Sequence, residues 1–203
     1  MRSFSILSRA VAGIALASLT LSSALAAAPA PAAEAAPAAA PAPPGQPTVV
    51  RESGDWVARC FPVATASPCD MYQELADRET KQKVLGISIA FIPSSDRYAI
   101  QISVPLGVAL ANGVVVSMGS YNSPAMKFRR CDRGGCYVET LLDATIPDKM
   151  AASGNEGVIK IVANNDKPFP IKFSLNGFSG AREAMMEAAR QKAKAPAAAA
   201  PAK

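Results

Sequence analysis

The chain has 203 residues, half of them hydrophobic, and its formal net charge is +5. It contains four cysteines and no histidine. Without histidine there is no imidazole base, which excludes Ser-His-Asp and Cys-His hydrolases. So small an excess of positive charge does not indicate a nucleic-acid-binding surface. We therefore expect no nucleic-acid partner, no catalytic residues and no cofactor.

The N-terminus has the pattern of a secretory signal peptide over residues 1–26. Arg2 and Arg9 precede an apolar run over residues 10–21, and Ala24-Leu25-Ala26 supplies the small residues of a cleavage site. The apolar run is shorter than the roughly 20 residues that cross a bilayer. We expect cleavage near Ala26, a mature chain without a transmembrane span, and a periplasmic or secreted location.

Composition divides the remaining chain into three parts. Residues 27–47 are almost entirely alanine and proline, a composition that cannot bury a core and predicts an extended spacer. Residues 48–186 are long enough for one domain. Residues 187–203 hold the expected end of a helix and an Ala/Pro/Lys-rich tail.

Four cysteines in an exported chain indicate two disulfides, for which three pairings exist. We favour Cys60 with Cys69 and Cys131 with Cys136, because each pair is close in sequence and encloses a turn. Eight and four residues separate the partners, a spacing that fits neither a thioredoxin-type redox motif nor a zinc site. We therefore expect no metal, and a stapled β-hairpin around Gly134-Gly135.

Alternation of apolar and polar residues predicts antiparallel strands through the domain. Val84 to Ile92 and Arg97 to Val104 form the strongest pair, joined by a turn at residues 93–96. Asn112-Gly113 predicts a second hairpin, between residues 108–111 and 114–118. Further strands are expected at residues 56–61, 69–75, 127–130, 137–141, 158–163 and 170–175.

Helical character is confined to two segments. Residues 147–153 predict a single helical turn, and a longer helix is expected from Ser179 to the Ala195 tract. Many short strands with turns every 8 to 12 residues indicate an all-β antiparallel sandwich. A closed barrel is the alternative, and the pattern does not separate the two.

Five groups of residues, taken together, resemble the invasion-associated locus B family of bacterial envelope proteins. They are Gly54-Asp55-Trp56 with Cys60, Cys69 with Gln73, Pro105-Leu106-Gly107-Val108 with Gly113-Val114, Phe128 and Cys131 with Gly135-Cys136, and Ser174-Leu175-Asn176-Gly177-Phe178. The resemblance runs from Gly54 to about Met186 and implies an immunoglobulin-like sandwich. The family takes its name from pathogens in which a member promotes entry into red blood cells, and it has no known active site to transfer to this chain.

Around the stapled hairpin, a span of seven residues contains four cations, Lys127, Arg129, Arg130 and Arg133. A rigid hairpin would present them as a fixed surface for phosphate, lipid A-like or sulfated-sugar groups. The alternative is an ordinary charged edge that discourages strand pairing.

Two pairs of carboxylates are the remaining candidates for hydrolytic chemistry. Asp70 with Glu74, and Asp143 with Asp148, would have to converge in a cleft. We expect each to be a solvated surface group instead.

The sequence therefore favours a non-enzymatic exported protein that contacts a protein, lipid or glycan of the cell envelope or host surface. The alternative is a periplasmic module that binds a small molecule or lipid between its sheets. A filled core with an exposed basic or apolar patch would support the first function, and a deep apolar pocket the second.

Overall fold

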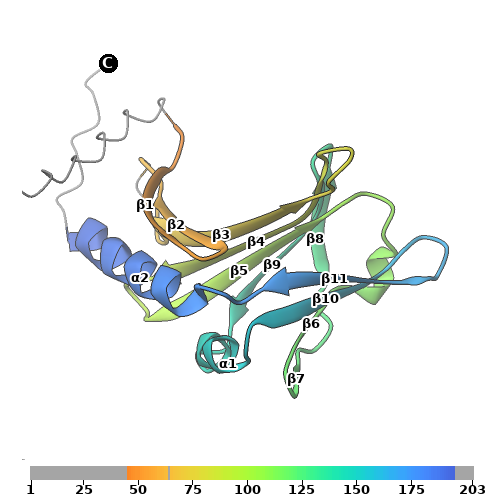
Figure 1. Cartoon of the computed structure of the whole chain (residues 1–203). Helices are drawn as coiled ribbons and strands as arrows, with labels where there is room; N and C mark the ends of the chain where they lie inside the picture. Colours follow the sequence, from red (N-terminus) through yellow and green to blue (C-terminus); the bar gives the residue numbers. More distant parts are fainter. Residues whose placement is uncertain (1–44, 64, 195–203) are drawn as a thin grey trace, which may run out of the picture. The chain divides into compact units, whose positions relative to one another are not determined.

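The computed structural model describes residues 45–63 and 65–194, which form two antiparallel sheets and two α-helices (Figure 1). The expected signal peptide, most of the spacer and the tail lie outside these residues. The larger sheet has the strand order β1-β2-β3-β4-β5-β9-β8, and the smaller has β11-β10-β6-β7. The elements are β1 (Thr48–Ser53), β2 (Trp56–Cys60), β3 (Cys69–Ala76), β4 (Lys83–Ile92), β5 (Arg97–Val104), a 3₁₀ turn (Leu110–Asn112), β6 (Val115–Met118), β7 (Tyr121–Asn122), β8 (Phe128–Asp132), β9 (Gly135–Leu142), α1 (Ile146–Ala152), β10 (Glu156–Val162), β11 (Pro168–Ser174) and α2 (Phe178–Lys194).

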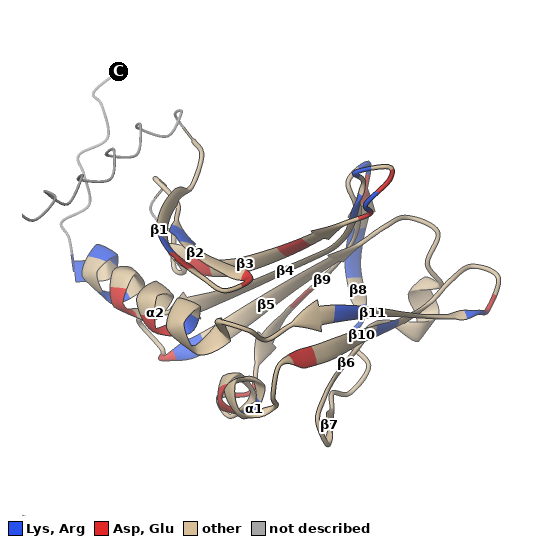
Figure 2. Cartoon of the chain, viewed as in Figure 1, with Lys and Arg blue, Asp and Glu red and all other residues tan. Residues whose placement is uncertain are grey.

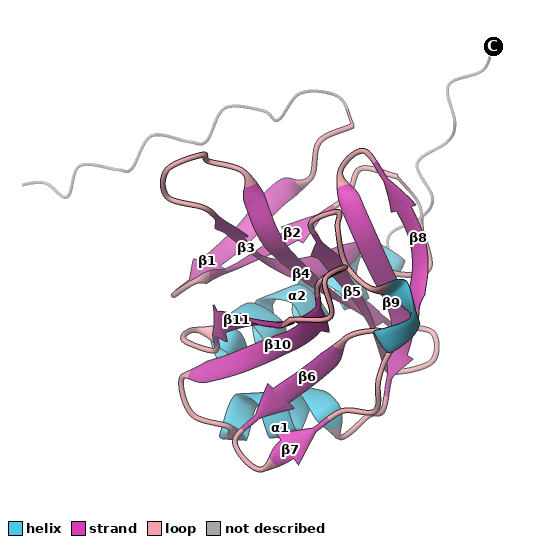
Figure 3. Cartoon of the chain, turned by 90° about the vertical axis from the view of Figure 1, so that its right-hand side faces the viewer, coloured by secondary structure: helices cyan, strands magenta, loops and turns pink. Residues whose placement is uncertain are grey.

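The two sheets form separate layers, so the expected all-β sandwich with a C-terminal helix is confirmed (Figure 3). Its likeness to an immunoglobulin fold lies in these facing antiparallel sheets, while β1 to β5 follow one another in the larger sheet as a simple meander. Each sheet has two different outer strands and does not close on itself. The barrel alternative is therefore wrong for the described residues.

The expected pairing of β4 with β5 is confirmed, and it builds much of the core. Ile87 lies opposite Ile102 and Ile89 opposite Ile100, and all four side chains are buried. The intervening positions, among them Ser88, face the outside of the sheet and are only partly buried. Helix α2 packs against β1, β2, β3 and β4, and its Ala189 is fully buried, so packed structure continues past residue 186.

The hairpin expected at Asn112-Gly113 is wrong, because the two flanking segments pair with different strands. Val108 forms a bridge with Ala163, whereas Val114 forms a bridge with Met126. Between them residues 110–112 make a 3₁₀ turn. A reversal does occur here, but tertiary contacts on each side override the local preference for a two-residue hairpin.

Strand β1 was not expected from the sequence. Five of its six residues are exposed, so it shows no alternation between a core face and a solvent face. It exists because its backbone pairs with β2, with a register shift between Val49 and Arg51.

A buried amide joins the beginning of the domain to its end. The Gln73 side chain donates hydrogen bonds to the carbonyls of Asp55 (3.2 Å) and Ser174 (3.1 Å), and accepts one from the Ser174 N–H (3.0 Å). Trp56 Nε1 donates to the same Ser174 carbonyl (2.9 Å), and its ring meets Phe178 edge-on at 5.3 Å. We call this arrangement the Gln73 clasp. It brings three of the sequence motifs, around Trp56, Gln73 and Ser174, into one contact.

Gly177 allows the chain to enter α2 at this point. Its φ is +80°, and a Cβ there would lie 2.0 Å from the Ser53 carbonyl oxygen. Both the left-handed backbone and the close approach require glycine.

Replacing Gln73 by Leu is expected to lower the free energy of unfolding by about 2 kcal/mol or more, because the Ser174 N–H and two carbonyls lose a partner in a buried site. Urea unfolding of the purified protein measures this loss. The control is Gln191→Leu, on the exposed part of α2, where a change within about 0.5 kcal/mol is expected. Equal losses in the two variants would contradict a special role for the clasp.

Candidate functional site: the cationic hairpin

The hairpin of β8 and β9 is closed at its tip by a disulfide. Cys131 lies directly opposite Cys136, with the two Cα atoms 4.0 Å apart. The Asp132 carboxylate accepts a hydrogen bond from the Gly134 N–H (2.7 Å), which fixes the turn. At Gly135 φ is +132°, a backbone conformation that favours glycine. The tip is therefore rigid.

Both expected disulfides are confirmed, since Cys60 is bonded to Cys69 in the same way as Cys131 to Cys136. All four cysteines of the chain are thus oxidised. Over residues 45–63 and 65–194, no three Cys, Asp or Glu side chains gather as metal ligands would.

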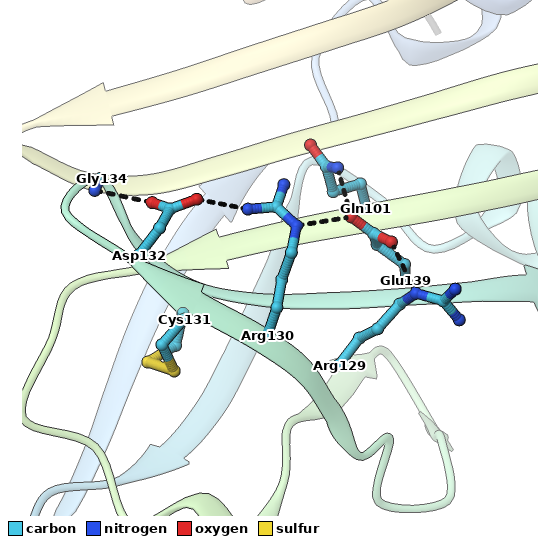
Figure 4. Close-up of polar contacts among 8 residues, drawn as sticks. Gln101, Arg129, Arg130, Cys131, Asp132, Gly134 and Glu139 are labelled. Carbon is cyan, nitrogen blue, oxygen red and sulfur yellow. Dashed lines mark hydrogen bonds and ion pairs between the residues drawn. A yellow bond between two sulfur atoms is a disulfide. The ribbon is translucent and has the colours of Figure 1, made fainter.

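A β-bulge in β8 directs two neighbouring arginines to the same carboxylate. Phe128 pairs with Val138 and Arg130 with Tyr137, so Arg129 is an extra residue in β8. Adjacent residues of a regular strand would point to opposite faces. Here Arg129 Nε and Arg130 Nε lie 3.2 Å and 3.4 Å from the two oxygens of Glu139 (Figure 4).

Further contacts hold Arg130 and Glu139 in place. The Arg130 guanidinium lies over the Tyr137 ring at 3.8 Å and also pairs with Asp132. Glu139 accepts a hydrogen bond from Gln101 Nε2 at 3.0 Å, across from it on β5 (Figure 4). Arg130 is therefore part of the hairpin's own structure, while the Arg129 side chain remains 70% exposed.

The Asp132 carboxylate keeps its charge well into the acid range. The hydrogen bond from the Gly134 N–H lowers the pKa of Asp132, and contacts with Tyr137 and Arg130 act in the same direction. A lowered pKa means that this contribution to hairpin stability is present above the ordinary pKa of aspartate and is lost as the pH falls through the lowered value.

Lys127 and Arg133, the other two predicted cations, are exposed and form no ion pair within the described part of the chain. The surface formed by residues 127–139, which we call the cationic hairpin, thus has four cations against two carboxylates. Figure 2 shows this excess of Lys and Arg along β8 and at its tip. The structure brings all four predicted residues to one hairpin, with two of them partly neutralised.

A hollow of about 660 Å³ lies on the outer face of the larger sheet and reaches from Arg59 to Arg129. Asp70, one of the predicted carboxylates, lies in it. The expectation of a solvated surface group is wrong for Asp70, because this residue is only 3% exposed, is held by Arg59 (2.8 and 3.1 Å) and accepts a hydrogen bond from Ser88 (2.6 Å). Arg59 also covers the Tyr72 ring at 4.0 Å.

The other predicted carboxylates have partners of their own. Glu74 accepts a hydrogen bond from the Tyr72 hydroxyl. The pKa of Tyr72 is raised, mainly by burial and secondly by this hydrogen bond. Asp148 pairs with Arg182 at 2.8 Å. Asp143 accepts hydrogen bonds from Thr145, which lower the pKa of Asp143. In neither predicted pair, Asp70 with Glu74 or Asp143 with Asp148, do the two carboxylates contact each other, since each has a different partner.

The sequence did not single out Leu110, which lies beside the cationic hairpin. It lines a second hollow, of about 510 Å³, together with residues 127–131. The sequence pattern predicts a strand over residues 108–111, whereas the structure has a 3₁₀ turn at Leu110–Asn112. The exposure of Leu110 therefore could not be inferred from alternation.

Comparisons with known proteins agree with this fold. The family model "Invasion associated locus B (IalB) protein" matches residues 56–186, more than half of the chain, so the chain belongs to this family. The crystal structure of invasion associated protein B from Bartonella henselae is similar, with a TM-score of 0.61 and 18% identity, over 71% of this chain and 99% of that one. The search of curated proteins gives no match. Among the described residues no helix is long and apolar enough to cross a membrane.

Replacing Glu139 by Gln removes the carboxylate shared by Arg129 and Arg130. Retention on heparin, used as a sulfated polyanion probe, is expected to require more salt for elution because the patch gains net positive charge. The control Glu156→Gln removes an exposed carboxylate on β10, where it pairs with Lys172. If the two variants elute alike, the cationic hairpin is not where a polyanion binds.

Proposed function

We propose that this protein is an exported, non-enzymatic component of the cell envelope that binds anionic groups of an envelope or host-surface partner through the cationic hairpin. The observation that carries the proposal is an exposed excess of positive charge on a hairpin stapled at Cys131–Cys136. A rigid charged surface loses little conformational entropy when it binds.

Export is supported by the chemistry of the cysteines and by the N-terminal sequence. Disulfides persist in oxidising compartments such as the periplasm and the extracellular medium. The first 26 residues have the charged start, apolar run and small-residue site of a cleavable leader.

A role without catalysis is supported by the state of the reactive groups. The cysteines are joined in disulfides, histidine is absent from the sequence, and Asp70 is held by Arg59. Of the predicted carboxylates, Asp70 and Asp148 are in ion pairs and Asp143 accepts hydrogen bonds from Thr145 in a turn.

The filled core favours surface contact over a ligand held between the sheets. The largest side chains there are less than 2% exposed and include Trp56, Phe91, Phe173, Phe178, Met71 and Ile159. The two hollows described above lie instead on the outer face of the larger sheet and beside β8.

The triple variant Lys127→Ser, Arg129→Ser and Arg133→Ser tests the proposal. Arg130 is left in place because it packs on Tyr137. Each Lys or Arg near an anionic surface contributes about 1 kcal/mol, so binding to heparin and to phosphatidylglycerol vesicles at low salt is expected to weaken on the order of a hundredfold. The melting temperature should stay nearly unchanged, since these side chains are exposed.

The matched control replaces Lys160, Lys167 and Lys172 by Ser. These three cations are exposed and lie on or between β10 and β11, so the net charge changes equally while the cationic hairpin stays intact. The control should keep most of the affinity. Equal losses would mean that net charge alone governs binding, and unaltered binding by the hairpin variant would reject the proposal.

A further inference from the structure

Two exposed leucines lie next to the cationic hairpin. Leu106 is 59% exposed and Leu110 is 53% exposed. Both belong to the segment from residue 105 to 114, which connects β5 with β6 through the 3₁₀ turn. Single exposed leucines are common on protein surfaces, so their meaning depends on how firmly the segment is held and on what lies beside it.

The segment is fixed to the protein on both sides. Toward β10, the Ala109 N–H donates to the Val162 carbonyl at 2.8 Å. Toward β8, Val114 and Met126 exchange two backbone hydrogen bonds of 2.9 and 2.8 Å. A Cβ at Gly113 would lie 2.5 Å from the Met126 carbonyl oxygen, so the two backbones are in close contact. The two leucines are therefore exposed on a segment whose backbone is fixed by hydrogen bonds on both sides.

The segment that carries the two leucines lies close to the cations. Leu110 lines the hollow of about 510 Å³ with Lys127 and Arg129. Leu106 follows Pro105, whose Cα lies 3.8 Å from the Cβ position of Gly135 at the hairpin turn. The exposed Leu110 side chain thus lines the same hollow as two of the cations, and Leu106 directly follows a residue whose backbone lies at the hairpin turn.

We propose that the anionic partner is a lipid surface, with Leu106 and Leu110 entering the interfacial layer while Lys127, Arg129 and Arg133 meet the phosphates. This inference rests on the proposed function and specifies its partner. Apolar side chains flanked by cations are the features that hold a protein at an anionic bilayer. A sulfated glycan offers the charge without an apolar phase, so it would leave the leucines without a role.

The test is flotation of the exported protein with vesicles of phosphatidylcholine containing one quarter phosphatidylglycerol. The double variant Leu106→Ser and Leu110→Ser should bind these vesicles about tenfold more weakly, because less apolar surface enters the interface. Its elution from heparin should be unchanged, since heparin supplies no apolar layer.

The control Val49→Ser and Val50→Ser removes apolar groups of similar exposure, 53% and 46%, from β1, the opposite outer strand of the larger sheet. It should float as the unaltered protein does. Flotation of the leucine variant at the unaltered level, or an equal loss in the valine control, overturns the lipid proposal while charge-dependent binding to heparin still supports the function. If the Lys127, Arg129 and Arg133 variant binds both heparin and the vesicles as strongly as the unaltered protein, the proposed function itself is overturned.

Discussion

Gln73 is a buried amide, 4% exposed, whose three hydrogen bonds join the turn before β2 to the last residue of β11. A buried amide left without partners would cost about 1 to 3 kcal/mol, so the fold depends on these hydrogen bonds. Trp56 shares the Ser174 carbonyl and packs on Phe178, which begins α2. Strands β2 and β3 of the larger sheet are thereby joined to β11 of the smaller sheet and to the start of α2.

The clasp and the candidate site lie at different places on the larger sheet. The clasp joins β2 and β3 to β11, while the cationic hairpin contains β8, the outer strand beyond β4, β5 and β9. Substitutions in the hairpin therefore leave the contacts of the Gln73 clasp in place. This separation is what makes charge variants on β8 informative about function.

Sequence patterns predicted the parts of the fold that depend on local alternation. Ile87, Ile89, Ile100 and Ile102 show the period of two that a half-buried strand requires, and both disulfides follow from short spacings around turns. The pattern failed where pairing overrides local preference. Asn112-Gly113 is a strong hairpin signal, yet its flanks bond to β10 and to Met126.

The sequence predicted the four cations of the candidate site but not the contacts that they make. Four cations near the stapled turn are visible in the sequence, whereas the bulge at Arg129 that turns two arginines toward Glu139 depends on the register of β8 with β9. The exposure of Leu110 depends on backbone contacts to two other segments. Such features arise from tertiary pairing and have no local signature.

The most direct test of contact between this surface and a lipid layer is hydrogen exchange measured by mass spectrometry, with and without phosphatidylglycerol-containing vesicles. If the surface contacts lipid, amide exchange within residues 105–114 and 127–139 becomes slower when vesicles are present, and exchange in β10 and β11 is unchanged. Slower exchange confined to β10, β11 or β1, or no change at a vesicle concentration that binds the protein, would contradict this contact.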